Sequence, residues 1–226
     1  MKKTLIGTLA IVLGTSLSIS CTKKIDLKMA VEVFSQPEKA EVRYHGKTVG
    51  ETPKLLQIAT YDDLGAIVAV KPDLDVVEKR IRILSSDKAE LLFRFGKGEI
   101  SPVARKLGLT RVLVFEYSEK VSFDSNKADL KPEGLSILDR QAEILNQHFP
   151  NATVYVCGYT DSTGSDELND KLSLQRAEAV RTYLVSKNVD PARMKTQGFG
   201  KQFEIASNST PEGRALNRRT EVILPQ

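Results

Sequence analysis

The segment 158–177 carries the residues of this chain that are best placed to do chemistry. Gly-Tyr-Thr-Asp-Ser-Thr-Gly-Ser puts the carboxylate of Asp161 in a loop, and Leu-Ser-Leu-Gln-Arg-Ala puts Arg176 on a helix predicted over 165–187. On an ideal helix, Arg176 and Asn169 fall within the apolar stripe. That stripe is formed by Leu168, Leu172, Ala179, Val180 and Tyr183. A charge turned inward is costly unless it is paired. We therefore expect Asp161 to pair with Arg176 in a small polar pocket.

Two further motifs flank this segment. Val121-Ser-Phe-Asp-Ser-Asn, with Leu130-Lys-Pro-Glu after it, comes before the segment, and Gly213-Arg-Ala-Leu-Asn-Arg-Arg comes near the end of the chain. With G-Y-T-D-S-T-G and N-x-x-L-S-x-x-R-A between them, these motifs resemble the OmpA-like C-terminal domain of OmpA, Pal and MotB proteins. The resemblance covers residues 112–226.

The resemblance implies that the domain binds peptidoglycan through diaminopimelate, or a similar diamino acid, of the peptide stem. Such a ligand presents an ammonium and a carboxylate. Asp161 can accept a hydrogen bond from the ammonium, and Arg176 can hold the carboxylate with two parallel hydrogen bonds. Five other positions match the family's ligand-binding residues: Asp124, Ser125, Asn126, Thr160 and Asn169. The alternative is that Asp161 and Arg176 form only an internal salt bridge that fixes the loop. Arg218 and Arg219 receive little weight, because we expect one of them to be a solvated charge.

The elements expected around this pocket alternate between strands and helices. Strands are predicted over 111–121, 152–158, 194–198 and 220–224, and helices over 132–148, 165–187 and, as a single turn, 212–216. Pro132 suits the first turn of its helix because it lacks an N–H donor. The order predicts an α+β fold, βαβαβ, with helices packed on one face of a mixed sheet.

The N-terminal residues have the pattern of a bacterial lipoprotein signal. Residues 1–20 combine two lysines with a short apolar run and small residues before Cys21. We expect acylation of Cys21, with palmitate or a similar chain, followed by a tether over 21–28. Ordinary secretion with an incidental cysteine is the alternative. Thr22 in place of Asp favours the outer membrane, with the protein facing the periplasm.

Residues 29–96 alternate between apolar and polar residues and are interrupted by turn glycines, which predicts a small all-β domain. The stretch Ala40-Glu-Val-Arg-Tyr-His-Gly-Lys-Thr-Val-Gly-Glu-Thr-Pro resembles the PEGA module of bacterial surface proteins. We expect His45 to be a turn residue. The glycines and prolines of 97–111 indicate a linker before the second domain.

The composition argues against two other classes of function. The net charge is +4 and no basic face recurs, so nucleic-acid binding has no support. Only two histidines occur, in different predicted domains, and Asp166 suits a helix N-terminus better than a catalytic pair. We therefore expect no enzyme, no cofactor and no metal site, and Cys157 is expected to be an inert buried thiol.

The sequence thus predicts a tether that joins the outer-membrane lipid, through Cys21, to peptidoglycan, through the second domain. The alternative is a surface-exposed adhesin or an envelope assembly partner that acts through the N-terminal β-domain and an unknown protein.

Overall fold

The structure of the chain is a computed structural model, and it describes residues 29–59, 61, 63–85, 87–96, 100–118, 123 and 127–226. The predicted signal peptide, Cys21 and the tether lie outside the described residues, as do Asp124, Ser125 and Asn126. The strands are β1 (Met29–Gln36), β2 (Glu41–Tyr44), β3 (Lys47–Glu51), β4 (Lys54–Ile58), β5 (Ile67–Val70), β6 (Val76–Ser85), β7 (Lys88–Phe95), β8 (Val112–Ser118), β9 (Val154–Gly158), β10 (Met194–Gly198) and β11 (Arg219–Pro225). The helices are α1 (Asp63–Ala66), α2 (Pro102–Lys106), α4 (Pro132–His148), α5 (Asp166–Ser186), α6 (Pro211–Asn217) and the 3₁₀ turn η1 (Pro191–Arg193).

One mixed sheet runs through both halves of the chain. Its strand order is β10-β9-β11-β8-β6-β7-β1-β4, and β6 pairs with β8 in parallel from Glu78↔Val112 to Ile83↔Tyr117. The segments predicted as two domains therefore contribute strands to the same sheet. The boundary at 97–111 stays a prediction. It contains α2 and lies between β7 and β8 in the chain.

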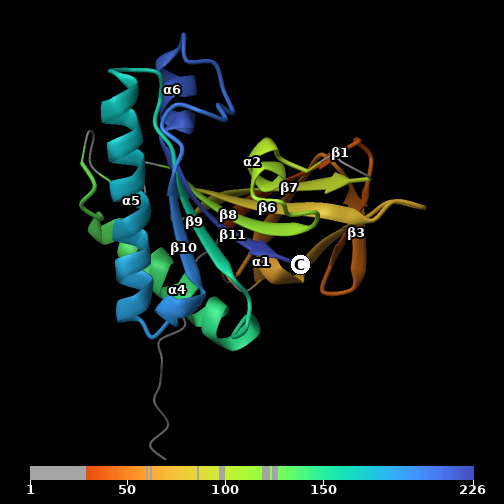
Figure 1. The fold of residues 1–226 in the computed structure, drawn as a ribbon. Coiled ribbons are helices and arrows are strands. Elements are labelled where there is room, and N and C mark those ends of the chain that lie inside the picture. Colours follow the sequence, from red (N-terminus) through yellow and green to blue (C-terminus); the bar gives the residue numbers. More distant parts are fainter. Residues whose placement is uncertain are drawn as a thin grey trace, which may run out of the picture.

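Side chains alternate between the two faces of this sheet. On one face, Phe115 and Tyr117 of β8 and Val222 of β11 join a core that α4 and α5 cover. On the other face, Val114 and Ile223 pack with α2 in a second, smaller core. Figure 1 shows α4 and α5 together on one side of the sheet and α2 on the other. The predicted βαβαβ arrangement, with its two long helices on one face, is therefore present.

A second sheet, β3-β2-β5, closes the N-terminal half. Val42 on β2 and Ile67 on β5 are fully buried in the same core as β1, β6 and β7. β2 and β3 form the predicted hairpin, with His45 (φ 47°) and Gly46 (φ 76°) at its turn. Two successive positive φ angles are what a tight two-residue hairpin requires. The resemblance to a PEGA module stays a prediction.

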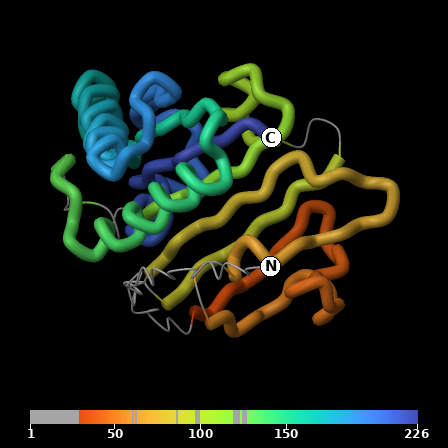
Figure 2. Tube along the Cα trace, turned by 90° about the horizontal axis from the view of Figure 1, so that it is seen from below, coloured from red at the N-terminus to blue at the C-terminus, as the bar shows by residue number. Residues whose placement is uncertain are grey.

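Figure 2 views the molecule from below, with α4 on one side of β6 and the N-terminal strands on the other. The sequence did not predict β4 or the one-turn helix α1. Every predicted element of 112–226 is present, with ends shifted by at most a few residues. In the part of the chain that the structure describes, no helix has the length and apolar character needed to cross a membrane.

Candidate functional site

Asp161 lies in the loop between β9 and α5, where two donors fix its carboxylate. The backbone N–H of Thr163 donates to Oδ1 at 2.8 Å, and the guanidinium of Arg218 donates to Oδ2 at 2.7 Å. Burial raises the pKa of the Asp161 carboxyl, but the hydrogen bonds from Arg218 and Thr163 outweigh it and hold the pKa below its ordinary value. The group is therefore a carboxylate at neutral pH, with about a tenth of its side chain (10%) exposed to solvent.

The partner of Asp161 is the main correction to the predicted site. The sequence predicts Arg176 as the partner, but the ion pair is made by Arg218, one of the two arginines given little weight as ligand contacts. Arg218 follows the last turn of α6, and its N–H donates to the carbonyl of Arg214, so the helix end directs it toward the loop. Figure 1 shows α6 and the first turn of α5 at the same end of the molecule.

Two asparagines fix the loop before α6 against the Asp161 loop. Asn217 is 1% exposed, accepts hydrogen bonds from the N–H groups of Ile205 and Ala206, and donates to the side-chain oxygen of Asn208. That Asn208 oxygen also accepts from the backbone N–H of Ser162 at 3.2 Å. The sequence motif at 213–219 contains Asn217, but its spacing alone gave no indication of this contact.

Arg176 points into the protein, as the helical periodicity predicts. Only 1% of the residue is exposed. Its Nε donates to the carbonyl of Lys127 at 3.1 Å, and its guanidinium carbon lies 5.2 Å from the centre of the Phe123 ring. In the chain, Phe123 and Lys127 lie on either side of the predicted ligand residues Asp124, Ser125 and Asn126, which are outside the described residues.

The remaining predicted residues support the Asp161 loop. Asn169 is 5% exposed, and its side-chain NH₂ donates to the carbonyl of Thr163 at 3.0 Å. Thr160 is 4% exposed, and its backbone N–H donates to the carbonyl of Gly200 at 2.8 Å. Ser165 caps α5 by accepting a hydrogen bond from the N–H of Leu168. Asp161 and Asn169 thus both hold Thr163, before the N-terminus of α5.

The buried face of α5 is more polar than the predicted stripe. Leu168 is 66% exposed, whereas Ser173 is fully buried. The cause is close packing of the helix on β9 and β10, since a Cβ at Gly158 would lie 2.0 Å from the carbonyl oxygen of Ser173 and one at Gly198 2.6 Å from the backbone nitrogen of Leu174. The helix therefore contacts the sheet through its backbone and small side chains, and this close contact buries Arg176.

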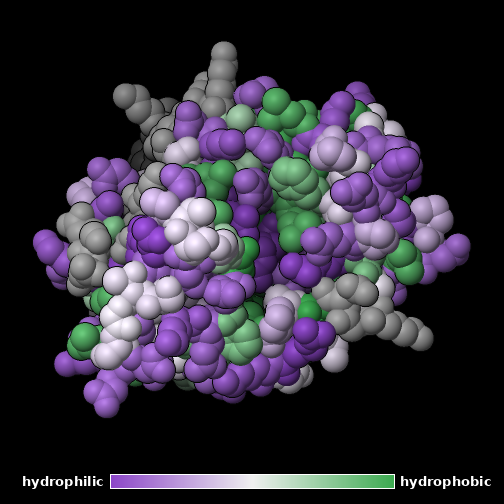
Figure 3. All heavy atoms as spheres, turned by 90° about the horizontal axis from the view of Figure 1, so that it is seen from above, coloured by the Kyte–Doolittle hydropathy of each residue, from purple (hydrophilic) through white to green (hydrophobic). Residues whose placement is uncertain are grey.

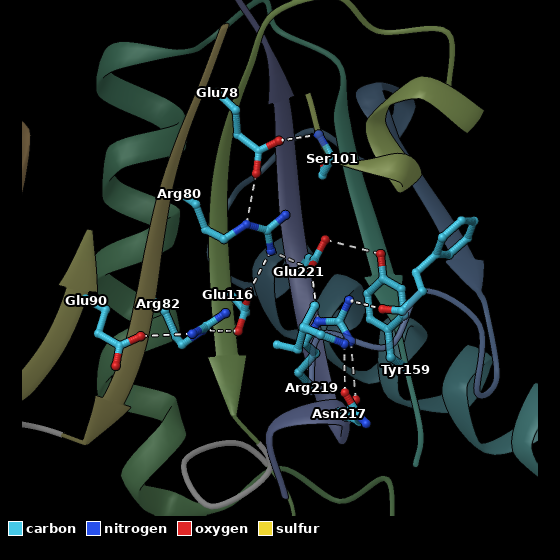
Figure 4. A network of polar contacts seen from close by, with 12 residues as sticks. Glu78, Arg80, Arg82, Glu90, Ser101, Glu116, Tyr159, Asn217, Arg219 and Glu221 are labelled. Atoms are coloured by element: carbon cyan, nitrogen blue, oxygen red, sulfur yellow. Dashed lines mark hydrogen bonds and ion pairs between the residues drawn. The ribbon is translucent and has the colours of Figure 1, made fainter. Parts of the chain in front are cut away.

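A buried charge network lies on the opposite face of the sheet and joins its two halves (Figure 4). Arg80 on β6 donates to Glu78 at 2.9 Å, and to Glu116 on β8 and Glu221 on β11 at 2.6 Å each. Glu221 also accepts from Arg219 at 2.9 Å. All five side chains are at most 6% exposed, so each charge is stabilised by its charged partners and not by water.

The network extends to the loop beside the Asp161 site. Arg219 stacks on the ring of Tyr159, with its guanidinium carbon 3.8 Å from the ring centre, and donates to the carbonyl of Phe203 at 3.0 Å. Burial raises the pKa of Glu221, but Arg80 and Arg219 outweigh it and lower the pKa to about 2.

Figure 3 looks at the molecule from above, where a few hydrophobic side chains border a central hollow in a mainly hydrophilic surface.

The described residues contain no group of three or more His, Cys, Asp or Glu that could hold a metal ion. Cys157 is fully buried, and burial raises the pKa of its thiol well above the ordinary value. The Asp161 loop offers a fixed carboxylate and its hydrogen-bond donors.

Comparison with known proteins places this site within a family. Residues 122–218 match the model of the OmpA family. The chain is 46% identical over 112 residues to the probable lipoprotein YiaD of Escherichia coli K12, covering 50% of this chain and 51% of that protein. It is 45% identical over 104 residues to the peptidoglycan-binding protein ArfA of Mycobacterium tuberculosis H37Rv, covering 46% of this chain and 32% of ArfA.

Among solved structures, the peptidoglycan-associated lipoprotein from Burkholderia pseudomallei is 31% identical with a TM-score of 0.43, covering 46% of this chain and 87% of that one. The chain spans about half the length, or less, of the curated relatives it matches. The family match contains Asp161, Arg176 and Arg218. Residues 122–218 of this chain therefore form an OmpA-like domain.

Proposed function

We propose that this protein binds the peptide stems of peptidoglycan non-covalently through the Asp161 loop and Arg176, and that it has no enzymatic activity. The observation that carries the proposal is the fixed Asp161 carboxylate, held between Arg218 and the N–H of Thr163 while part of it still reaches solvent. A carboxylate held in this way is ordered before the ligand arrives, so binding need not order it. The name of the relative ArfA, a peptidoglycan-binding protein, supports the same ligand.

The ligand we propose is the diamino acid of the stem, diaminopimelate or a close analogue. Its free ammonium would donate a hydrogen bond to Asp161, and its carboxylate would accept two hydrogen bonds from the guanidinium of Arg176. Asp124, Ser125 and Asn126 are proposed to complete the contacts, because their neighbours Phe123 and Lys127 both contact Arg176. Thr160 and Asn169 would act by holding the loop.

We further propose that acylated Cys21 anchors the protein in the outer membrane, facing the periplasm. The signal-like residues 1–20 and the lipoprotein relative YiaD support this anchor. A protein held at both ends would stay close to a polymer of repeated ligands, so rebinding would make retention stronger than a single contact.

The test is sedimentation with purified sacculi in the presence of soluble diaminopimelate. We expect the protein to pellet with sacculi and to be released as diaminopimelate is added, while lysine at the same concentration releases less because it lacks the second carboxylate. Protein that stays in the supernatant without competitor would contradict the proposal. Release by lysine and diaminopimelate to the same extent would contradict the diamino acid assignment.

A further inference from the structure

A cavity of about 1010 Å³ lies between α4 and the N-terminal strands, on the sheet face opposite the charge network. Its volume is at the upper end of the range of roughly 300–1,000 Å³ typical of pockets for small organic ligands. Its walls are mainly apolar side chains, among them Leu64 of α1, Ile67 of β5, Ile81 of β6, Phe93 of β7, Phe115 of β8 and Ile144 of α4. Figure 2 looks at this side of the molecule.

A lysine lies in this apolar wall. Lys79 projects from β6, and its Nζ donates to the carbonyls of Leu64 and Ile67 at 2.9 Å each, 5.5 Å from the centre of the Phe93 ring. An ammonium has three N–H donors. The two carbonyls leave one N–H of Lys79 for a ligand. Burial lowers the pKa of Lys79 to about 8, so most of the group is still charged at neutral pH.

A tyrosine hydroxyl in the same cavity lacks a partner. The oxygen of Tyr61 is buried and makes no hydrogen bond in the structure, which is unusual for a buried hydroxyl. Burial raises the pKa of Tyr61 far above its ordinary value, so this group is a neutral donor. Arg111 and Arg140 also line the cavity, whereas none of the described lining residues is Asp or Glu.

We propose that this cavity binds an amphiphile with one acyl chain and one anionic head group. The apolar walls accept the chain, since burying each methylene is worth about 0.8 kcal/mol. The Lys79 ammonium and the Tyr61 hydroxyl donate to the head, which satisfies the hydroxyl that otherwise has no partner. Lys79, Arg111 and Arg140 give the lining an excess of cationic side chains, although Arg140 is also paired with Glu143, and this excess selects an anion over a cation. No residue of this cavity belongs to the Asp161 site.

Displacement of a fluorescent probe tests this site. Dansylated undecanoic acid is titrated into the full chain carrying Cys21→Ser, so that the protein's own acyl group cannot compete and detergent is not needed. We expect saturable binding, displacement by dodecanoate, and displacement by dodecylamine that is weaker by at least about tenfold, because a charge-assisted hydrogen bond is lost. Dodecanoate and dodecylamine acting equally, or binding that does not saturate, would overturn the proposal.

Four substitutions locate the ligand. Lys79→Met should weaken dodecanoate binding at least about tenfold, and Tyr61→Phe by a smaller factor. Gly65→Trp adds a large side chain at a lining position where a Cβ meets no heavy atom within 4 Å, so the fold should tolerate it, and a loss of dodecanoate binding would place the ligand beside α1. Lys195→Met is the matched control, since Lys195 lies 5.3 Å from the Tyr155 ring centre and is not among the lining residues.

The sacculus assay separates this site from the proposed function, because all four variants should pellet with sacculi as wild type does. Should Lys79→Met fail to fold, Tyr61→Phe decides the question, since its hydroxyl makes no hydrogen bond in the fold. Wild-type affinity for dodecanoate in a folded Tyr61→Phe variant would overturn the assignment.

Discussion

Arg80 on β6 donates to Glu221 on β11 at 2.6 Å across the intervening strand β8, although the two residues are 141 positions apart in the chain. The contact joins β6 of the N-terminal half to β11 of the C-terminal half, with Glu116 of β8 between them. Stability of the C-terminal half should therefore depend on residues of the N-terminal half.

Arg80→Ala should lower the free energy of unfolding by about 3–5 kcal/mol, because it leaves Glu78, Glu116 and Glu221 buried without their main cation. Urea denaturation followed by circular dichroism measures the change. Arg43→Ala is the control, since its pair with Glu41 is exposed and should change little. Equal stability of the two variants would show that the network does not join the halves.

Glu221 should make the fold sensitive to acid. Its pKa lies near 2 in the folded protein, against an ordinary value of 4.5, so its contribution is present above about 4.5 and is lost as the pH falls toward 2. A shift of this size corresponds to roughly 3 kcal/mol. Urea denaturation at a series of pH values should show this loss. Glu221→Gln should be less stable at neutral pH and lose less between these values. A parallel pH dependence for wild type and variant would contradict the coupling.

The charge network could not be predicted from the sequence, because it joins strands from distant parts of the chain. Arg80 and Arg82 alternate with Ile81 and Ile83 along β6, a pattern typical of a strand with one solvated face. The parallel pairing of β6 with β8 buries Arg80, and parallel pairs between distant segments have no local turn signal. Periodicity could predict the strand but not its neighbour.

The candidate site divides in the same way. Helical periodicity correctly predicted that Arg176 and Asn169 face inward, because the direction of a side chain on a helix depends only on the residues of α5 itself. The predicted partner of Asp161 was wrong, because the true partner, Arg218, is 57 residues away in the chain. Only the fold of the 199–210 loop and α6 brings it to Asp161. The stripe was misplaced at Leu168, since glycine contacts rather than leucines decide how α5 sits on the sheet.

Gly158→Ala should separate α5 from β9, because the added methyl would lie 2.0 Å from the carbonyl oxygen of Ser173. Overpacking of this kind costs about 1–3 kcal/mol, or more when only backbone can move. Thermal unfolding measures the loss. Gly65→Ala is the matched control, since a Cβ there meets nothing within 4 Å and should be neutral or slightly stabilising. Wild-type stability of Gly158→Ala would contradict the packing described for α5.

Cys21 should carry the lipid anchor. Metabolic labelling with a clickable fatty acid should mark the wild-type protein, whereas Cys21→Ser should remain unlabelled and leave the membrane fraction. Cys157 is a useful internal check, because burial keeps its thiol from reacting. Labelling of both proteins, or of neither, would remove the anchor from the proposed tether.

The most direct test of peptidoglycan recognition is sacculus sedimentation of Asp161→Asn beside Asp166→Asn. Both substitutions remove one negative charge, but Asp166 is an exposed acid, 73% exposed, in the first turn of α5. Losing the Asp161 charge should weaken binding by about 2–5 kcal/mol, since Asp161 is the proposed partner of the ligand ammonium and also orders the loop. We predict that Asp161→Asn, folded by circular dichroism, stays in the supernatant while Asp166→Asn pellets like wild type. Equal pelleting of the two variants would contradict the assignment of this loop as the binding site.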